Sequence, residues 1–131
     1  VWDRHRSSRL IATVLCNRFI PPVVLHEKER GVFDVVDGKQ RLSTILAWMT
    51  ADEDLTQKTR RLLPDFDQLS KLDEEYDALN GLRFRDLCSE RRSAFETYCV
   101  VSMTIPLDTP DDDVYAVYED INSGSQDLTP Q

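Results

Sequence analysis

The chain has 131 residues, of which 40% are hydrophobic and 31% are charged, and its formal net charge is −8. This length suffices for one domain with a core, and the composition is ordinary for a soluble protein. The negative charge argues against non-specific binding to nucleic-acid phosphates, and no apolar stretch approaches the roughly 18 residues of a membrane span. We therefore expect no membrane partner, and the three cysteines, odd in number, fit a reducing, intracellular setting that is cytoplasmic or nuclear.

The first predicted helix covers residues 3–18, and the prolines at positions 21 and 22 end it. Its apolar stripe consists of Leu10, Ile11, Val14 and Leu15. A basic run lies at the start of the same helix, formed by Arg4, His5, Arg6 and Arg9. We interpret this run as a solvated face, which is the usual role of such charges.

Two short strands are predicted next, over residues 23–27 and 32–36, and the turn between them is short enough for a hairpin. The second strand leads into a helix over residues 39–51. Leu42, Ile45, Leu46 and Met49 of this helix are spaced i, i+3, i+4 and i+7. That spacing predicts that these four side chains form its buried face.

The later part of the chain alternates irregular and regular patterns. Short helices are predicted near residues 58–63, 69–76 and 90–97, and residues 82–87 form a strand or an extended loop. Residues 98–105 are rich in β-branched side chains and predict a strand. Thr109, Pro110 and three aspartates then mark the start of a helix, which should end at residues 122–125. Residues 128–131 suggest the cap of a further helix, and Val1 is not a methionine, so we expect truncation at both ends.

No metal site or disulfide framework is predicted. Cys16, Cys88 and Cys99 are odd in number and contain no C-x-x-C spacing. We expect Cys16 and Cys99 to be small buried side chains. The aspartates at positions 111–113 are explained by the positive end of the helix that they precede.

Residues 37–41, with the sequence Asp-Gly-Lys-Gln-Arg, join the second strand to the following helix. The backbone N–H groups of the first helical turn have no partners within the helix, and Lys39 and Arg41 add positive charge. This junction can therefore hold an anion such as a phosphate. Asp37 and Gln40 also have the spacing of a capping box, and the two interpretations remain open together.

Two segments resemble a known family. Residues 35–45 resemble the D-G-Q-Q-R-L-T-T motif of the GmrSD-type restriction endonuclease N-terminal domain, within the ParB/sulfiredoxin-like superfamily. Residues 117–128 resemble its second motif, F-E-R-I-N-x-G-x-x-L, and Trp2 and residues 20–23 resemble its opening signature and strand entry. Lys39 replaces the first glutamine, and Asp120 stands where arginine is usual.

This resemblance covers nearly the whole chain. It is consistent with a single α+β domain over residues 1–131, in which a small mixed β-sheet packs against several helices. It implies that a nucleoside triphosphate with Mg²⁺ binds at residues 37–41. The implied catalytic residues are Asp37, Gln40 and Arg41, and the implied nucleotide-binding residues are Gly38, Lys39, Arg41, Asn122 and Gly124.

The implied function is a sensor or regulatory domain of a modification-dependent, restriction-like DNA defence protein. Hydrolysis of the triphosphate and the identity of the base stay open, and DNA would be reached through other parts of the protein. The alternative is a non-catalytic module that binds protein or DNA and retains the fold, with Asn122 serving only as a helix cap. A sulfiredoxin-like phosphotransfer to an oxidised cysteine is weaker, because residues 37–41 contain no cysteine.

Overall fold

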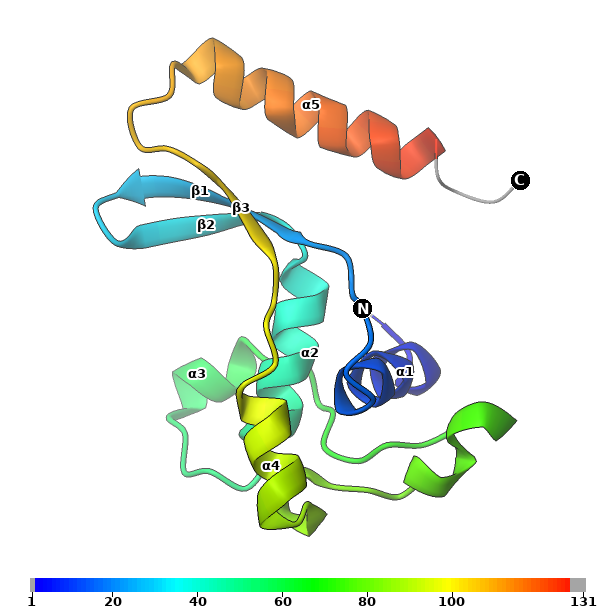
Figure 1. Ribbon diagram of the computed structural model, residues 1–131. Helices are drawn as coiled ribbons and strands as arrows, with labels where there is room; N and C mark the ends of the chain where they lie inside the picture. The colour runs from blue at the N-terminus through cyan, green and yellow to red at the C-terminus, as the bar shows by residue number, and fades with distance from the viewer. Residues whose placement is uncertain (1, 128–131) are drawn as a thin grey trace. The chain divides into compact units, whose positions relative to one another are not determined.

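The computed structural model describes residues 2–127, and it describes their side chains up to residue 123. The regular elements, in chain order, are α1 (Arg4–Leu15), β1 (Val23–Glu29), β2 (Val32–Asp37), α2 (Lys39–Met49), α3 (Gln57–Arg61), α4 (Ser89–Glu96), β3 (Ser102–Ile105) and α5 (Asp111–Asp127) (Figure 1). Short 3₁₀ segments lie at Glu74–Leu79 and Phe84–Asp86. This element content confirms the predicted α+β class.

The chain divides into two compact units. Unit 1 contains Val1–Pro21 and Gln40–Val100, and unit 2 contains Pro22–Lys39 and Val101–Gln131. The chain thus passes from unit 2 back into unit 1 within residues 37–41. The assignment of all 131 residues to a single domain stays a prediction.

Unit 2 contains a mixed three-stranded sheet with the order β2-β1-β3. β1 pairs with β2 antiparallel, with His26 opposite Asp34, so the predicted hairpin is confirmed. β1 pairs with β3 parallel, with His26 opposite Ile105. β3 is shorter than the predicted strand over residues 98–105, because pairing with β1 begins only where the Val23 N–H donates to the Val101 carbonyl at 2.9 Å.

Helix α5 begins as predicted and ends later than predicted. The N–H groups of Asp113 and Val114 both donate to the Pro110 carbonyl, at 3.0 and 3.1 Å. The helix continues to Asp127, so the predicted end at residues 122–125 is wrong. Asn122 and Gly124 have low helix propensity, but propensity is a weak preference that a helix tolerates. The cap predicted at residues 128–131 lies outside the described residues.

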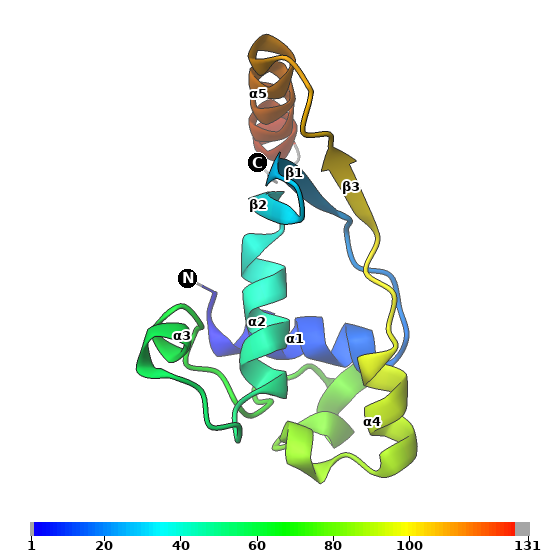
Figure 2. The ribbon, with the colours of Figure 1, turned by 90° about the vertical axis from the view of Figure 1, so that its left-hand side faces the viewer.

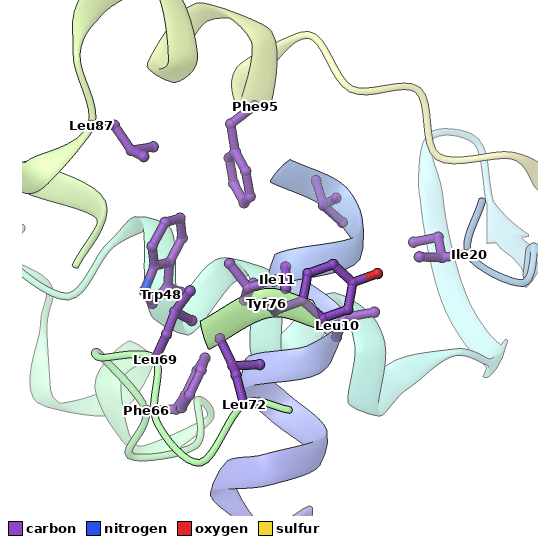
Figure 3. Packing of buried hydrophobic residues seen from close by; sticks show 12 residues of the cluster. Leu10, Ile11, Ile20, Trp48, Phe66, Leu69, Leu72, Tyr76, Leu87 and Phe95 are labelled. Atoms are coloured by element: carbon purple, nitrogen blue, oxygen red, sulfur yellow. The ribbon is translucent and has the colours of Figure 1, made fainter. Parts of the chain in front are cut away.

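The hydrophobic core of unit 1 is centred on Trp48 of α2, which is fully buried. Its ring lies 5.5 Å from that of Phe84 and 5.2 Å from that of Phe95, measured between centroids. Figure 2 shows α1 and α4 to the right of the lower part of α2, and Figure 3 shows the buried side chains of the cluster. The cluster comprises Leu10, Ile11, Ala12, Val14, Ile20, Trp48, Phe66, Leu69, Leu72, Tyr76, Leu87 and Phe95.

The buried face of α2 differs from the predicted one. Thr44, Ala47 and Trp48 are its buried residues, whereas Leu46 is 49% exposed. Burial of the large indole ring removes more apolar area from water than a leucine does, so the helix is rotated toward the Trp48 side. Ile45 and Met49 remain in partial contact with the core.

Helix α1 starts and ends with local caps. The Asp3 carboxylate accepts a hydrogen bond from the Arg6 N–H at 2.9 Å. The helix ends at Leu15, because Asn17 has a positive φ of 53°, and it therefore stops short of the prolines. The predicted burial of Cys16 and Cys99 is wrong, since both are exposed: Cys16 follows the last helical turn, and Cys99 precedes β3 outside the sheet.

The irregular part of unit 1, between α2 and α4, is stabilised by hydrogen bonds to loop backbone. Arg60 Nη2 donates to the carbonyls of Thr50 and Glu53, both at 3.0 Å. The Leu69 carbonyl accepts from the Gly81 N–H at 2.7 Å, which holds residue 69 outside the helix predicted there. Residues 82–87 contain a 3₁₀ turn in place of a strand. Among residues 2–127, no helix is both long and apolar enough to cross a membrane.

Candidate functional site

The junction between β2 and α2 has the predicted strand-turn-helix form. β2 ends at Asp37, α2 begins at Lys39, and only Gly38 lies between them. Gly38 is buried and has a φ of 97°, a conformation that side chains with a Cβ atom rarely adopt. The sharp turn that brings Arg41 into the first turn of α2 therefore depends on glycine at this position.

Arg41 lines a cavity of about 280 Å³ within unit 1. The other lining residues come from the start of the chain, from α1 and from the segment that follows it: Trp2, Arg6, Arg9, Leu10, Thr13, Phe19, Ile20 and Pro21. Three of the nine side chains are guanidinium groups, and none of the nine is a carboxylate. The wall is therefore suited to an anion.

One face of α1 supplies four of the nine lining residues. Arg6, Arg9, Leu10 and Thr13 are spaced i, i+3, i+4 and i+7, which places them on one side of the helix. Arg6 and Arg9 are exposed, while Leu10 is buried. The α1 side of the cavity thus has an apolar floor and two cationic groups at its rim.

Arg9 and Arg6 differ in whether their guanidinium groups are already engaged by other residues. Arg9 Nη1 forms an ion pair with Asp73 Oδ2 at 3.0 Å. Within the described part of the chain, the Arg6 guanidinium has neither an ion pair nor a hydrogen bond, because only its backbone N–H is engaged, by Asp3. Arg6 is therefore the rim cation that is most available to a ligand.

The remaining predicted site residues are divided between the two units. Asp37, Gly38 and Lys39 belong to unit 2, and Gln40 joins Arg41 in unit 1. Lys39 is exposed, and Asp37 and Gln40 are half-buried. The structure thus brings Arg41 to a cavity, while the catalytic roles of Asp37 and Gln40 stay predictions.

Asn122 and Gly124 both lie on α5 in unit 2. Asn122 is exposed and lines a hollow of about 610 Å³ together with Tyr118 and Glu119 of the same helix. Gly124 lies in the last part of the helix, where side chains are not described. Their predicted role as the opposite wall of a nucleotide site stays a prediction.

Arg6 and Arg9 are the residues that the sequence interpretation missed. Their run with Arg4 was interpreted as a solvated face, yet the structure places both beside Arg41 at the cavity. The available signal was the i, i+3 spacing of Arg6 and Arg9, which places both on one helical face with Leu10 and Thr13. Arg4 does not line the cavity, so the basic run has two distinct sides.

A resident divalent cation does not fit this wall. Cations bind to carboxylate and carbonyl oxygens, and the cavity presents guanidinium and apolar side chains. In residues 2–123, no group of three or more His, Cys, Asp or Glu side chains is placed to hold a metal ion. Any Mg²⁺ at this cavity would have to arrive with the phosphates of a ligand.

A second cavity of unit 1, of about 610 Å³, lies at the C-terminal end of α1 and is lined in part by Arg18, Phe19 and Tyr98. Arg18 Nη1 donates to Glu75 Oε1 at 2.5 Å and to Tyr76 Oη at 2.7 Å, so its charge is already compensated. Tyr98 Oη donates to the Arg18 carbonyl at 2.6 Å, and burial raises the pKa of this phenol. These contacts indicate a structural role.

The structure thus has an α+β fold, and unit 1 contains a cationic pocket to which α2 contributes Arg41 from its first turn. Comparison with known protein families matches residues 1–131, the whole chain, to the GmrSD restriction endonuclease, N-terminal domain. The chain belongs to this family, which gives it the context of a restriction-like defence protein. Searches of curated proteins and of solved structures return no match.

Proposed function

We propose that this domain binds a nucleoside triphosphate with Mg²⁺ at residues 37–41 and serves as a sensor or regulatory domain of a modification-dependent restriction protein. The observation that carries the proposal is the position of Arg41, which lies at the first turn of α2 and lines a cavity with Arg6 and Arg9. We also propose the ParB/sulfiredoxin-like superfamily as the wider relationship of the fold.

The chemistry of the cavity supports an anionic ligand. A guanidinium group presents several N–H donors in a planar fork that matches two phosphate oxygens at once. The first turn of α2 adds partial positive charge in the same region of the chain. A phosphate at this turn would therefore gain both a charged partner and backbone donors.

Hydrolysis is the further step of the proposal. Asp37 lies one residue before Gly38 and Gln40 two residues after it, and we assign to them the orientation of the attacking water. Mg²⁺, when bound with the nucleotide, would neutralise charge on the phosphates. Lys39 extends the positive charge of the turn, and Asn122 and Gly124 complete the proposed nucleotide-binding set.

Calorimetric titration of the whole chain with ATP, GTP and CTP in the presence of Mg²⁺ tests the binding step. The proposal expects saturable heat for the wild type and its loss in Arg41→Ala, with partial recovery in Arg41→Lys. Arg61→Ala is the matched control, because it removes the same charge from the exposed face of α3. Equal heats for the wild type and Arg41→Ala, with both variants folded by circular dichroism, would overturn the proposal.

Phosphate release by the full-length protein tests the hydrolysis step. Turnover that disappears in Asp37→Asn while nucleotide still binds would support an enzyme. Turnover that is unchanged in this variant would contradict the role of Asp37.

The second candidate function is a non-catalytic interaction module. The observation that favours it is the exposure of apolar side chains on unit 2, where Val101 is 54% exposed and Met103 is 64% exposed. Solvent-exposed apolar groups at a sheet edge can contact another chain. Binding of a protein partner that Met103→Ser abolishes and Arg41→Ala leaves intact would favour this candidate.

A further inference from the structure

The lining and the size of the cavity around Arg41 indicate how it would choose among nucleotides. We propose that it selects its ligand by the number of phosphates and by an aromatic base stacked on Phe19, and that it discriminates little among the bases. This inference rests on the proposed function, since it concerns the selectivity of the same site.

The positions of the arginines favour a chain of phosphates over a single one. Arg6 and Arg9 are one helical turn apart on α1, at the rim, and Arg41 lines the same cavity from α2. One planar fork engages two oxygens of one phosphate, so further guanidinium groups along the same wall can engage the additional phosphates of a longer chain. Asp73 offsets part of the charge of Arg9, which makes Arg6 the main added contact.

The cavity is too small to enclose a whole nucleotide. Its volume of about 280 Å³ is at the lower end of ligand cavities, which span roughly 300–1,000 Å³. One end of a bound nucleotide must therefore extend beyond the cavity. Phe19 lines the cavity and is 74% exposed, so its ring offers a flat apolar surface to that end.

Stacking on an aromatic ring tolerates any base, because every base has a π face. Discrimination among the bases would need side chains that form hydrogen bonds with the edge of the base. Apart from the arginines, the lining side chains are aromatic or aliphatic with the exception of Thr13. The Thr13 hydroxyl donates to the Arg9 carbonyl at 2.9 Å, so its proton is already engaged.

Dissociation constants of the whole chain for AMP, ADP, ATP, GTP, CTP and inorganic tripolyphosphate, each with Mg²⁺, test this inference. We expect ATP to bind at least about tenfold more tightly than AMP, and Arg6→Gln to reduce that ratio by about tenfold. Arg4→Gln is the control, since Arg4 is on the same helix and does not line the cavity.

The role of Phe19 has its own pair of variants. Phe19→Leu should weaken ATP and GTP binding by about tenfold and leave tripolyphosphate binding unchanged, because only the stacking contact is lost. Leu62→Ala is the control, since Leu62 is also 74% exposed and lies outside the cavity.

Three results would contradict the inference. They are equal ATP-to-AMP ratios in Arg6→Gln and Arg4→Gln, equal losses of ATP and tripolyphosphate binding in Phe19→Leu, and a spread above about tenfold among ATP, GTP and CTP. In each case, ATP binding that depends on Arg41 would still support the proposed function. Absence of binding of ATP, GTP and CTP by the wild type would overturn both.

Discussion

Arg6 of α1 and Arg41 of α2 line the same cavity of unit 1, although the hairpin of β1 and β2 separates them in the sequence. Arg41 follows the turn at Gly38, and Arg6 lies on the face of α1 that also carries Arg9. Two local features, a glycine turn and a helical spacing, therefore combine into one cationic wall.

Gly38→Ala should lower the free energy of unfolding by about 1–3 kcal/mol, because alanine is strained at positive φ. The φ of Gly38 is 97°. Urea denaturation followed by circular dichroism measures the change. Asn17→Gly makes the opposite exchange. Asn17 has a φ of 53°, and glycine at this position relieves the backbone strain that a Cβ atom causes at positive φ. An alanine variant as stable as the wild type would contradict the turn geometry.

The two faces of α2 should respond very differently to truncation. Trp48→Ala should cost about 3–5 kcal/mol of stability, because it empties the centre of the core between Phe84 and Phe95. Leu46→Ala should cost less than about 1 kcal/mol, because half of that side chain is exposed. Comparable losses of stability in the two variants would contradict the buried face that the structure gives to α2 and would favour the face predicted from the sequence.

Tyr98→Phe removes the hydrogen bond to the Arg18 carbonyl and should cost about 1 kcal/mol near neutral pH. Burial raises the pKa of Tyr98 above its ordinary value of about 10, while a backbone hydrogen bond from Ile20 opposes the shift. The neutral phenol is thus the form that folding favours. Its contribution is complete below pH 10 and is lost as the pH rises through the folded-state pKa.

Thermal denaturation of the wild type and Tyr98→Phe between pH 8 and pH 11 follows this loss. The stability difference between the two proteins should shrink as the pH approaches the upper limit. A difference that stays constant over the whole range would show that the phenol does not titrate with folding.

Asp73→Asn should strengthen nucleotide binding several-fold, because it releases Arg9 from its ion pair at the cavity rim. Both partners are about half exposed, so the change in stability should be less than about 1 kcal/mol. Glu75→Gln is the matched control, since its partner Arg18 lies outside the Arg41 cavity. Equal affinities in the two variants would exclude Arg9 from the site.

Local patterns in the sequence predicted the positions of helices and strands more reliably than the faces that these elements bury or the cavities that they line. The hairpin, the Gly38 turn and α2 follow from β-branched runs and turn residues, which act over a few positions. The buried face of α2 was wrong because an apolar spacing cannot show that Trp48 has aromatic partners from residues 84 and 95. The cavity was missed for the same reason, since Arg6 and Arg41 come to line one cavity only in the folded unit.

The most direct test follows the side-chain Nε–Hε resonances of the arginines by NMR during titration with ATP and Mg²⁺. The proposed site predicts that the signals of Arg6, Arg9 and Arg41 shift along one saturable curve. Those of Arg60 and Arg83 should remain still, because these residues bind loop carbonyls and Asp67 instead. Saturable shifts confined to other residues, or no saturable shift at all, would contradict a nucleotide site at Arg41.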